Sequence, residues 1–206
     1  MKDINKSMLR AAVVLGIFAI VATALVAFTN SLTRERIDVA KRDYTLRKLN
    51  ELVPAQMHDN ELDQDPLQIN DPLLDKRNTV TIYRAQKDKQ VVAVIMQAVA
   101  PDGYSGRITL LVAIDQSGKL IGVRVTEHKE TPGLGDAIDT NKSDWIHIFT
   151  DKSLQNPAEK NWRVRRDNGE FDQITSATIT SRAVVKATYN ALRYFEQHKD
   201  TLLRTP

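Results

Sequence analysis

Residues 107–128 read "RITLLVAIDQSGKLIGVRVTEH", two runs rich in Val, Ile and Leu on either side of a polar stretch. Residues of this kind favour strands, and the Asp-Gln-Ser-Gly-Lys stretch at 115–119 is typical of a tight turn. The sequence therefore predicts a β-hairpin here. Two earlier runs, "TVTIYRA" at 79–85 and "QVVAVIMQAVA" at 90–100, share this composition. We expect all four runs to form a mainly antiparallel sheet.

The segments after these runs predict flanking helices. We expect a short helix at "DWIHIF", and a hairpin in which "WRVRR" and "EFDQI" flank the Asn168-Gly169 turn. The last stretch, "RAVVKATYNALRYF", has helical spacing of its apolar residues. The face that they predict consists of Val184, Ala187, Thr188, Ala191, Leu192 and Phe195. Strands followed by segregated helices indicate an α+β domain.

The N-terminal region contains an apolar segment. Residues 11–29 read "AAVVLGIFAIVATALVAFT", which is 19 residues without a charge. As a helix this segment is about 28 Å long, close to the hydrocarbon thickness of a bilayer. A cleaved signal peptide is the alternative, but its apolar core is normally only ~7–15 residues. We expect a single uncleaved transmembrane helix.

Charge around this segment predicts its orientation. Residues 1–10 carry Lys2, Lys6 and Arg10 against one acid, which favours a cytoplasmic tail. The rest of the chain would then lie in the periplasm of a bacterium, anchored in the inner membrane. Residues 30–78 predict a juxtamembrane helix that ends at Pro54, followed by an irregular connector. Residues 79–206 would form the periplasmic domain.

Composition excludes several classes of function. The net charge is only +3, which gives no indication of a nucleic-acid partner. The chain has no cysteine, so disulfides, thiolate metal sites and a cysteine nucleophile are excluded. The four histidines lack metal-ligand spacing, and "GYSGR" at 103–107 does not match a nucleophile elbow. We therefore expect no metal site and no catalytic residue of a serine hydrolase.

The stretch "FDQITSATITS" at 171–181 concentrates hydroxyl residues where the terminal helix begins. Five of them occur within seven positions: Thr175, Ser176, Thr178, Thr180 and Ser181. One hydroxyl is enough to cap a helix. A helix N-terminus also favours anions, so a hydroxyl there could carry a phosphate. The residues alone leave a phosphate site and a generous cap both open.

A second unusual stretch is "HKETPGLGD" at 128–136. Its two glycines, Gly133 and Gly135, could bring backbone N–H groups close to a ligand that a side chain would exclude. The spacing matches neither of the common glycine-rich phosphate loops, so a plain turn is the alternative.

Two of these stretches resemble the FMN-binding domain family. "DQITSATITS" is similar to the family's flavinylation motif, an acid followed by Ser/Thr-Gly-Ala-Thr, with Ser176 in place of the usual glycine. "ETPGLGD" resembles the flavin-side loop, and "GYSGRITLLVAID" the start of its glycine-bearing strand. The resemblance covers essentially the whole chain. Its length and final helix are most similar to the branch of the family found in the Rnf (Rsx) electron-transport complexes, and the sodium-pumping NADH:quinone reductase has a component with the same motif.

The resemblance implies a cofactor and its site. FMN would be attached covalently through its phosphate to Thr178, which makes the chain a phosphoprotein and flavoprotein. The remaining cofactor-binding residues would come from both motifs: Asp172, Thr175, Ser176 and Ala177, and Glu130, Thr131, Gly133, Leu134 and Gly135. We expect Asp172 to assist attachment.

The resemblance also implies a function and partners. The chain would be an electron-transfer subunit of a translocase that couples electron transfer to ion movement across the inner membrane. Its partners would be the membrane subunits of an Rnf-type complex, and a flavin transferase would load it. The alternative is a membrane-anchored scaffold or binding module without redox activity. A stand-alone flavin reductase ranks last, because no nicotinamide-binding fingerprint is present.

Overall fold

The structure, a computed structural model, describes residues 2–204 apart from the side chains of residues 2–5, 7 and 38. The chain divides into two compact units, Met1–Tyr44 and Thr45–Pro206. The prediction of a positively charged tail rests partly on Lys2, whose side chain lies outside the described residues. The structure does not test the predicted boundaries at residues 10, 29 and 78, nor on which side of a membrane the tail and the domain lie. These stay predictions.

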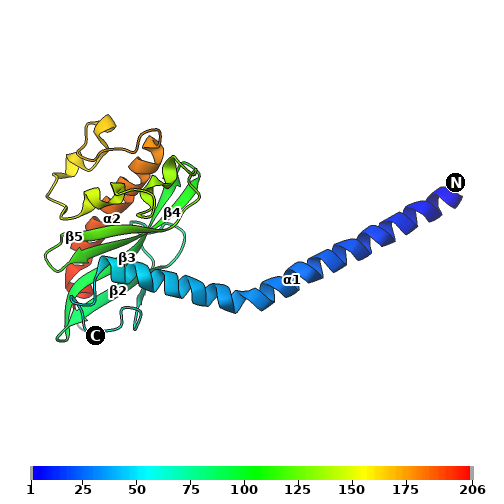
Figure 1. The fold of residues 1–206 in the computed structure, drawn as a ribbon, viewed down its shortest axis with the longest axis horizontal. Helices are drawn as coiled ribbons and strands as arrows, with labels where there is room; N and C mark the ends of the chain where they lie inside the picture. Colours follow the sequence, from blue (N-terminus) through cyan, green and yellow to red (C-terminus); the bar gives the residue numbers. More distant parts are fainter. Residues whose placement is uncertain (1, 205–206) are drawn as a thin grey trace. The chain divides into compact units, whose positions relative to one another are not determined.

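The first helix, α1, runs from Lys2 to Leu52 without interruption (Figure 1). From Met8 onward it is long and apolar enough to cross a membrane, and none of its most apolar stretch is buried. Its large apolar side chains, such as Leu15 and Phe18, are exposed in the chain alone. The helix ends two residues before Pro54, because proline cannot donate the backbone hydrogen bond that would continue it.

The second unit is built on a five-stranded antiparallel sheet. The strands are β1 Leu67–Ile69, β2 Val80–Lys87, β3 Gln90–Gly103, β4 Gly106–Asp115 and β5 Leu120–Glu127. They pair in sequence order as a meander. The turn between β4 and β5 forms where the sequence predicts it, since Asp115 Oδ1 accepts hydrogen bonds from the backbone N–H groups of Ser117 and Lys119. The predicted antiparallel α+β fold is confirmed.

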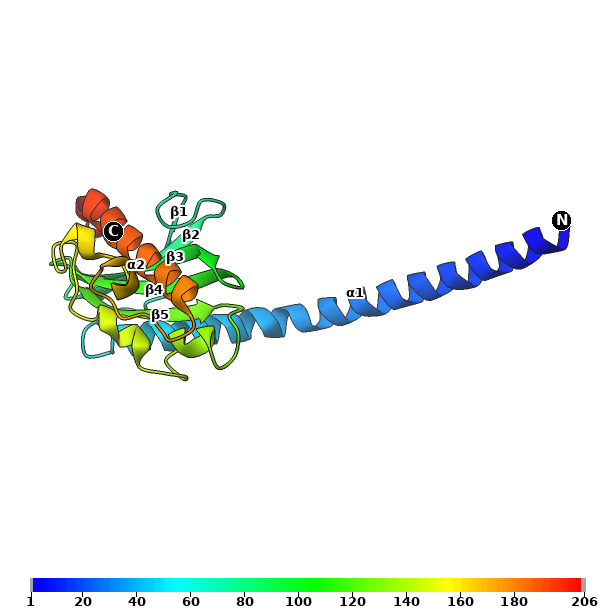
Figure 2. The same cartoon turned by 90° about the horizontal axis from the view of Figure 1, so that it is seen from above.

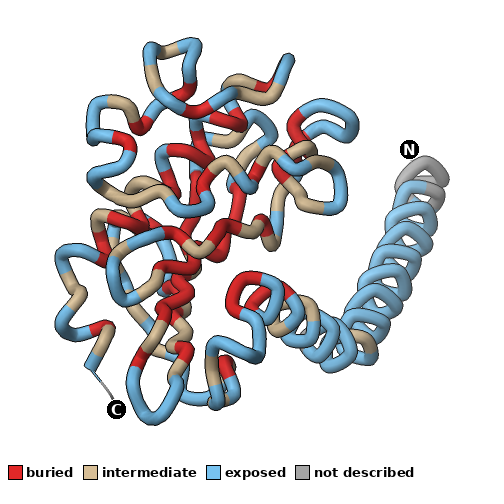
Figure 3. The backbone as a smooth tube through the Cα atoms, turned by 60° about the vertical axis from the view of Figure 1, so that its left-hand side comes forward, coloured by how far each residue is buried: buried red, intermediate tan, exposed pale blue. Residues whose placement is uncertain are grey.

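Both faces of this sheet are covered by apolar residues. One face packs against α2, the helix Thr178–Leu202, and the other carries the last turns of α1, where Leu49 and Leu52 are buried (Figures 1 and 2). Alternation along the strands separates the two layers, so in β4 Leu110 belongs to the α2 side and Leu111 to the α1 side. Buried residues concentrate along these strands and α2 (Figure 3). The predicted apolar face of α2 is buried throughout: Val184, Ala187, Thr188, Ala191, Leu192 and Phe195.

A layer of loops and short 3-10 helices covers the rest of the α2 side. It contains η1 Gly135–Ile138, η2 Trp145–Phe149, η3 Glu159–Asn161 and η4 Arg165–Asp167. Four aromatic rings hold this layer together, because Phe149, Trp162 and Phe171 pack on one another and Trp145 packs edge-on against Phe149. The segment that follows Trp162 lies beside the start of α2, since Arg166 hydrogen-bonds to Thr178 and the Ile174 N–H to Ser181.

Three local predictions differ from the structure. The connector is not wholly irregular, because Leu67–Ile69 adds an edge strand to β2. The predicted helix at 144–149 is a 3-10 helix. The hairpin around Asn168 does not form: the turn exists, with Asn168 at a φ of 60°, but the flanks make only one parallel bridge, Val164 to Phe171. The physical reason is that Val164 and Phe171 are both buried in the main core, where the Arg165 N–H donates to the Phe171 carbonyl and the Phe171 N–H to the Arg163 carbonyl, a parallel and not a hairpin pairing.

Candidate functional site

Helix α2 begins without a side-chain cap. Ala177 occupies the N-cap position, and no side chain accepts a hydrogen bond there. The backbone N–H groups of Thr178, Ile179 and Thr180 have no acceptor among the described residues. The interpretation that the hydroxyl cluster caps the helix is therefore wrong. The first turn of α2 presents unpaired donors, the arrangement that binds anions at helix N-termini.

Two of the five hydroxyls stabilise the protein itself. Ser181 Oγ accepts a hydrogen bond from the backbone N–H of Ile174 and donates one to the carbonyl of Ala177, both at 3.0 Å. Thr180 Oγ1 donates to the carboxylate of Glu130. Both hydroxyl side chains are buried. They fix the turn that leads into α2, and they are not free to bind a ligand.

The other three hydroxyls are accessible. Thr175 and Ser176 are exposed, and Thr178 is half-buried. Ser176 has a φ of 66°, in the left-handed region that favours glycine. The family pattern has glycine at this position, so the backbone retains the conformation that glycine would adopt. Thr178 is the first residue of α2, and its backbone N–H is one of the three unpaired groups.

The 128–136 loop is tied to the same place through Glu130. This carboxylate is 4% exposed and accepts hydrogen bonds from the backbone N–H of Ser105 and from Thr180 Oγ1. It thereby joins the β3–β4 turn, the loop and α2. The nearby imidazole of His128 takes part in the same turn, because its Nδ1 accepts a hydrogen bond from the Glu130 N–H. Neither residue lies in a group able to hold a metal ion within the part of the chain that the structure describes.

The two glycines of this loop are needed for different reasons. Gly133 has a φ of +77°, but a Cβ atom there would meet nothing within 4 Å. Gly135 has no positive φ, yet a Cβ atom would lie 2.8 Å from Glu130 Oε2 and 3.2 Å from Thr180 Oγ1. Gly133 thus permits the turn itself. Gly135 permits the close packing of the loop against Glu130 and α2.

Loop and helix start together line a pocket of about 680 Å³. Most of the residues predicted from the sequence line it: Glu130, Thr131, Leu134, Gly135, Ser176, Ala177 and Thr178. Three predicted residues, Asp172, Thr175 and Gly133, do not. The pocket also contains four residues that the predicted set lacks, namely Tyr104, Arg166, Ile179 and Thr180. Three of these lie within stretches already singled out, Tyr104 in "GYSGR", and Ile179 and Thr180 in "FDQITSATITS".

Arginines surround the helix start. Asp172 forms an ion pair with Arg165 at 3.0 Å, and Asp167 binds Arg182 of α2 through two hydrogen bonds. The hydrogen bonds from Arg182 lower the pKa of Asp167. Arg166, between these two pairs in the chain, instead donates from Nη1 to Thr178 Oγ1 at 3.5 Å. The sequence places Arg166 in the flank of a predicted hairpin and gives it no role in the site, so this contact was missed.

The pocket also has an apolar side. Among the described residues of the second unit, the large hydrophobic side chains that are exposed are Met57, Tyr104, Leu134 and Ile179. Three of the four line this pocket: Tyr104 is 68% exposed, Leu134 45% and Ile179 47%. Ligand sites commonly combine such apolar walls with a few polar groups at one end.

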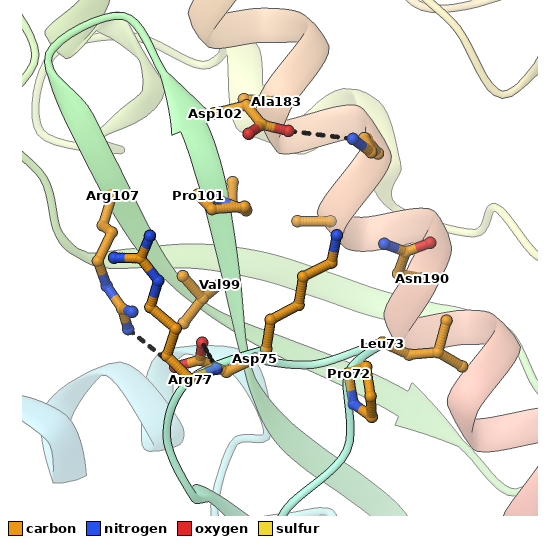
Figure 4. Close-up of a pocket in the computed structure, with 14 residues that line it drawn as sticks. Pro72, Leu73, Asp75, Arg77, Val99, Pro101, Asp102, Arg107, Ala183 and Asn190 are labelled. Carbon is orange, nitrogen blue, oxygen red and sulfur yellow. Dashed lines mark hydrogen bonds and ion pairs between the residues drawn. The ribbon is translucent and has the colours of Figure 1, made fainter.

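A second hollow of about 330 Å³ lies between the connector, the end of β3 and the middle of α2 (Figure 4). Its acids are neutralised, Asp75 by Arg107 at 2.9 Å and Asp102 by Lys186 at 3.0 Å. Burial raises the pKa of Asp75, but hydrogen bonds from Arg107 and other donors outweigh it and lower the pKa overall. Neither the 128–136 loop nor the 171–181 stretch contributes to this hollow, so it is not the site that the two motifs predict.

Two family models match parts of the chain. Residues 103–193 match the FMN-binding domain family, and residues 1–52 match the RnfG N-terminal region. The chain is 48% identical over 200 residues to the G subunit of the ion-translocating oxidoreductase complex of Pseudomonas aeruginosa, an alignment that covers 97% of this chain and 94% of that protein. The proteins of the same name from Shewanella loihica and Vibrio cholerae are each 44% identical, over 98% and 94% of this chain and 96% and 92% of their own length.

The chain belongs to the family of G subunits of ion-translocating oxidoreductase complexes. The resemblance drawn from the two motifs is thereby confirmed at the level of the family. The region that matches the FMN-binding domain contains the whole pocket, from Tyr104 to Thr180. Membership in this family makes FMN the cofactor against which the pocket is to be tested.

Proposed function

We propose that this chain is the electron-transfer subunit of an ion-translocating oxidoreductase complex, and that it carries FMN covalently through the cofactor's phosphate on Thr178. One observation carries the proposal. Thr178 is a half-buried hydroxyl at the first position of α2, inside a pocket whose helix N–H groups are unpaired. Family membership and the FMN-binding domain match support the same cofactor.

The polar end of the pocket fits a phosphate. A phosphodiester keeps one negative charge, which the positive end of the α2 dipole and the unpaired N–H groups of Ile179 and Thr180 would stabilise. Arg166 lines the same end. Thr178 lies on a rigid helix whose start is fixed by Ser181 and by the Thr180–Glu130 hydrogen bond. An attached group would therefore be held in one place.

The apolar end fits a flat aromatic ring. Tyr104, Leu134 and Ile179 would shield one end of the isoalloxazine from water, and Thr131 and Gly135 of the loop would line the same pocket around it. A volume of about 680 Å³ is within the usual range for cofactor sites, roughly 300–1,000 Å³. When bound, FMN supplies the one- and two-electron redox chemistry. The protein orients the ring and excludes water from part of it.

The alternative function, a scaffold without redox activity, rests on the capping interpretation of the hydroxyl cluster. The structure removes that support, because the N-cap is Ala177 and the hydroxyls that do bind protein groups serve the turn and the loop. The covalent flavoprotein is therefore the better-supported function.

Mutation of Thr178 tests the attachment. The full chain is produced with a flavin transferase, and flavin fluorescence is recorded after denaturing electrophoresis, together with the intact mass. The parent should carry one FMN phosphoester, and Thr178→Ala none. Thr175→Ala is the matched control, since it removes a hydroxyl outside the pocket and should leave the flavin in place. A flavin that survives in Thr178→Ala would overturn the assignment.

The proposed location is the inner membrane of a bacterium, with α1 as the single anchor and the FMN domain in the periplasm. The other membrane subunits of the complex would be its partners. Single cysteines at Ser117 and Lys199 should react in intact cells with a thiol reagent that does not cross the inner membrane, since the chain contains no other cysteine. A cysteine at Lys6 should react only after lysis. The reverse pattern would refute this topology.

A further inference from the structure

We propose that Arg166 is the positioning residue for the flavin phosphate. It would hold the phosphate during attachment to Thr178 and would anchor it afterwards. This inference rests on the proposed function, because it requires a phosphate on Thr178. It assigns a role to a residue outside both motifs, in the basic run "RVRR" at 163–166.

The arginines near the start of α2 differ in whether they form an ion pair with a carboxylate. Arg165 is engaged with Asp172, and Arg182 with both oxygens of Asp167. Arg166 forms no ion pair with a carboxylate among the described residues. It lines the pocket, and its guanidinium donates a hydrogen bond to Thr178 Oγ1 at 3.5 Å. Its positive charge helps to lower the pKa of Asp167 at longer range, but the group that its guanidinium contacts is the proposed acceptor atom.

Contacts of the neighbouring residues orient Arg166 toward the pocket. The residues on either side of Arg166 in the chain each form an ion pair. Arg165 pairs with Asp172, which precedes the hydroxyl cluster in the sequence, and Asp167 pairs with Arg182, which follows the cluster. The backbone N–H of Arg166 also donates to Gln173 Oε1 at 3.2 Å. This arrangement holds the 165–167 turn across the start of α2. The side chain of Arg166 consequently lies on the pocket side.

Attachment of the flavin phosphate to Thr178 is a phosphoryl transfer. In attachment, Thr178 Oγ1 gives its proton to a base of the transferase and bonds to the flavin-side phosphorus of a flavin dinucleotide held by that enzyme. The pyrophosphate P–O bond breaks, and a nucleoside monophosphate leaves with the bridging oxygen, so no oxidation or reduction occurs. Thr178 Oγ1 then is a phosphoester oxygen. The phosphate is one bond from the atom that Arg166 already contacts, and arginine binds phosphate oxygens through charge-assisted hydrogen bonds.

The test uses three variants of the full chain, coproduced with limiting transferase. Arg166→Gln removes the charge at the pocket, and Arg166→Lys restores it as a point charge. Arg163→Gln is the matched control, because it removes a positive charge from the same run outside the pocket. We expect Arg166→Gln to lower the flavin-to-protein ratio at least about three-fold, Arg166→Lys to recover part of it, and Arg163→Gln to equal the parent.

A second readout separates positioning from a purely structural role. Melting temperatures are measured for flavin-loaded and flavin-free protein of each variant. The flavin-free forms of the parent and Arg166→Gln should melt together, whereas the loaded variant should melt roughly 2–4 °C below the loaded parent. Equal loading and equal flavin-dependent melting shifts in Arg166→Gln and Arg163→Gln would overturn the role of Arg166 alone. A parent without flavin on Thr178 would overturn the proposed function as well.

Discussion

Thr180 Oγ1 donates a hydrogen bond to Glu130 Oε2, joining two buried side chains that are fifty positions apart in the sequence. This contact fastens the glycine-containing loop to the first turn of α2. It brings together the two stretches that the sequence singles out. The geometry of the pocket therefore depends on it, although neither atom is free to bind a ligand.

Removing this hydroxyl should destabilise the protein. Thr180→Val keeps the shape of the side chain but leaves a buried carboxylate oxygen without its donor, which costs about 1–3 kcal/mol of unfolding free energy. Thr188→Val is the matched control on the same helix, because the Thr188 hydroxyl is buried without a partner among the described residues. Urea denaturation of the flavin-free protein compares the two. A Thr188→Val variant that loses as much stability as Thr180→Val would contradict this account.

Ser176 should be a site of local strain. Its φ of 66° is unfavourable for a residue with a Cβ atom, and the family pattern has glycine there. Ser176→Gly should raise the unfolding free energy by about 0.5–1 kcal/mol, since relief of strain exceeds the entropy cost of glycine. Ser176→Ala, which removes the hydroxyl and keeps the strain, should not be stabilised. Equal effects in both variants would show that the hydroxyl, and not the backbone, decides stability.

The two loop glycines should respond differently to substitution. Gly135→Ala should cost about 1–3 kcal/mol in the flavin-free protein, because the new methyl group meets Glu130 and Thr180. Gly133→Val should impair flavin placement, and it strains the backbone at a φ of +77°. Gly133→Asn separates the two effects of that change, since asparagine tolerates the left-handed region. If Gly133→Asn folds like the parent but shifts the flavin spectrum or midpoint potential, the residue lies against the cofactor.

Substitution of Asp172 should lower flavin loading, and two possible causes of this loss can be distinguished. Asp172→Asn should lower the fraction of protein that carries FMN, while loaded molecules keep a parent-like spectrum. The proposed cause is a role in attachment, through the transferase or its Mg²⁺. The structure supplies another, because Asp172 pairs with Arg165 and thereby helps to orient the 165–167 turn. Arg165→Gln breaks the same pair and keeps the carboxylate. Reduced flavin loading in both variants would indicate that the ion pair is the cause. Reduced flavin loading in Asp172→Asn alone would indicate the role in attachment.

The Asp167–Arg182 pair should make stability depend on pH. Its hydrogen bonds lower the pKa of Asp167 below the ordinary value of 3.8. A carboxyl group with a lowered pKa in the folded state contributes stability above 3.8, and this contribution is lost as the pH falls through the folded-state pKa. The melting temperature of Asp167→Asn should therefore lie below that of the parent at pH 7, and the difference should shrink in acid. A difference that is unchanged at the lowest pH at which both remain folded would contradict the assignment.

The sequence by itself determined four of the five strands, the apolar α1 and the buried face of α2, because these follow from local periodicity and composition. Runs rich in Val, Ile and Leu between Thr79 and Glu127 specify strands, and the spacing of Val184, Ala187 and Ala191 specifies a helix face. The two motifs also indicated where the pocket would lie. Local sequence carries this information because each pattern reflects which side of one element is buried.

Only the tertiary structure decided how the hydroxyls are used. Ser and Thr favour N-cap positions, but residue type does not show which hydroxyl of a cluster acts as a cap. The sequence therefore could not show that Ala177 is the N-cap or that Thr180 is bound to Glu130. It could not place Arg166 beside Thr178, because aromatic packing of Trp162 and Phe171 replaces the expected hairpin and turns the basic run toward α2. Contacts between distant segments depend on packing in three dimensions, which local patterns do not encode.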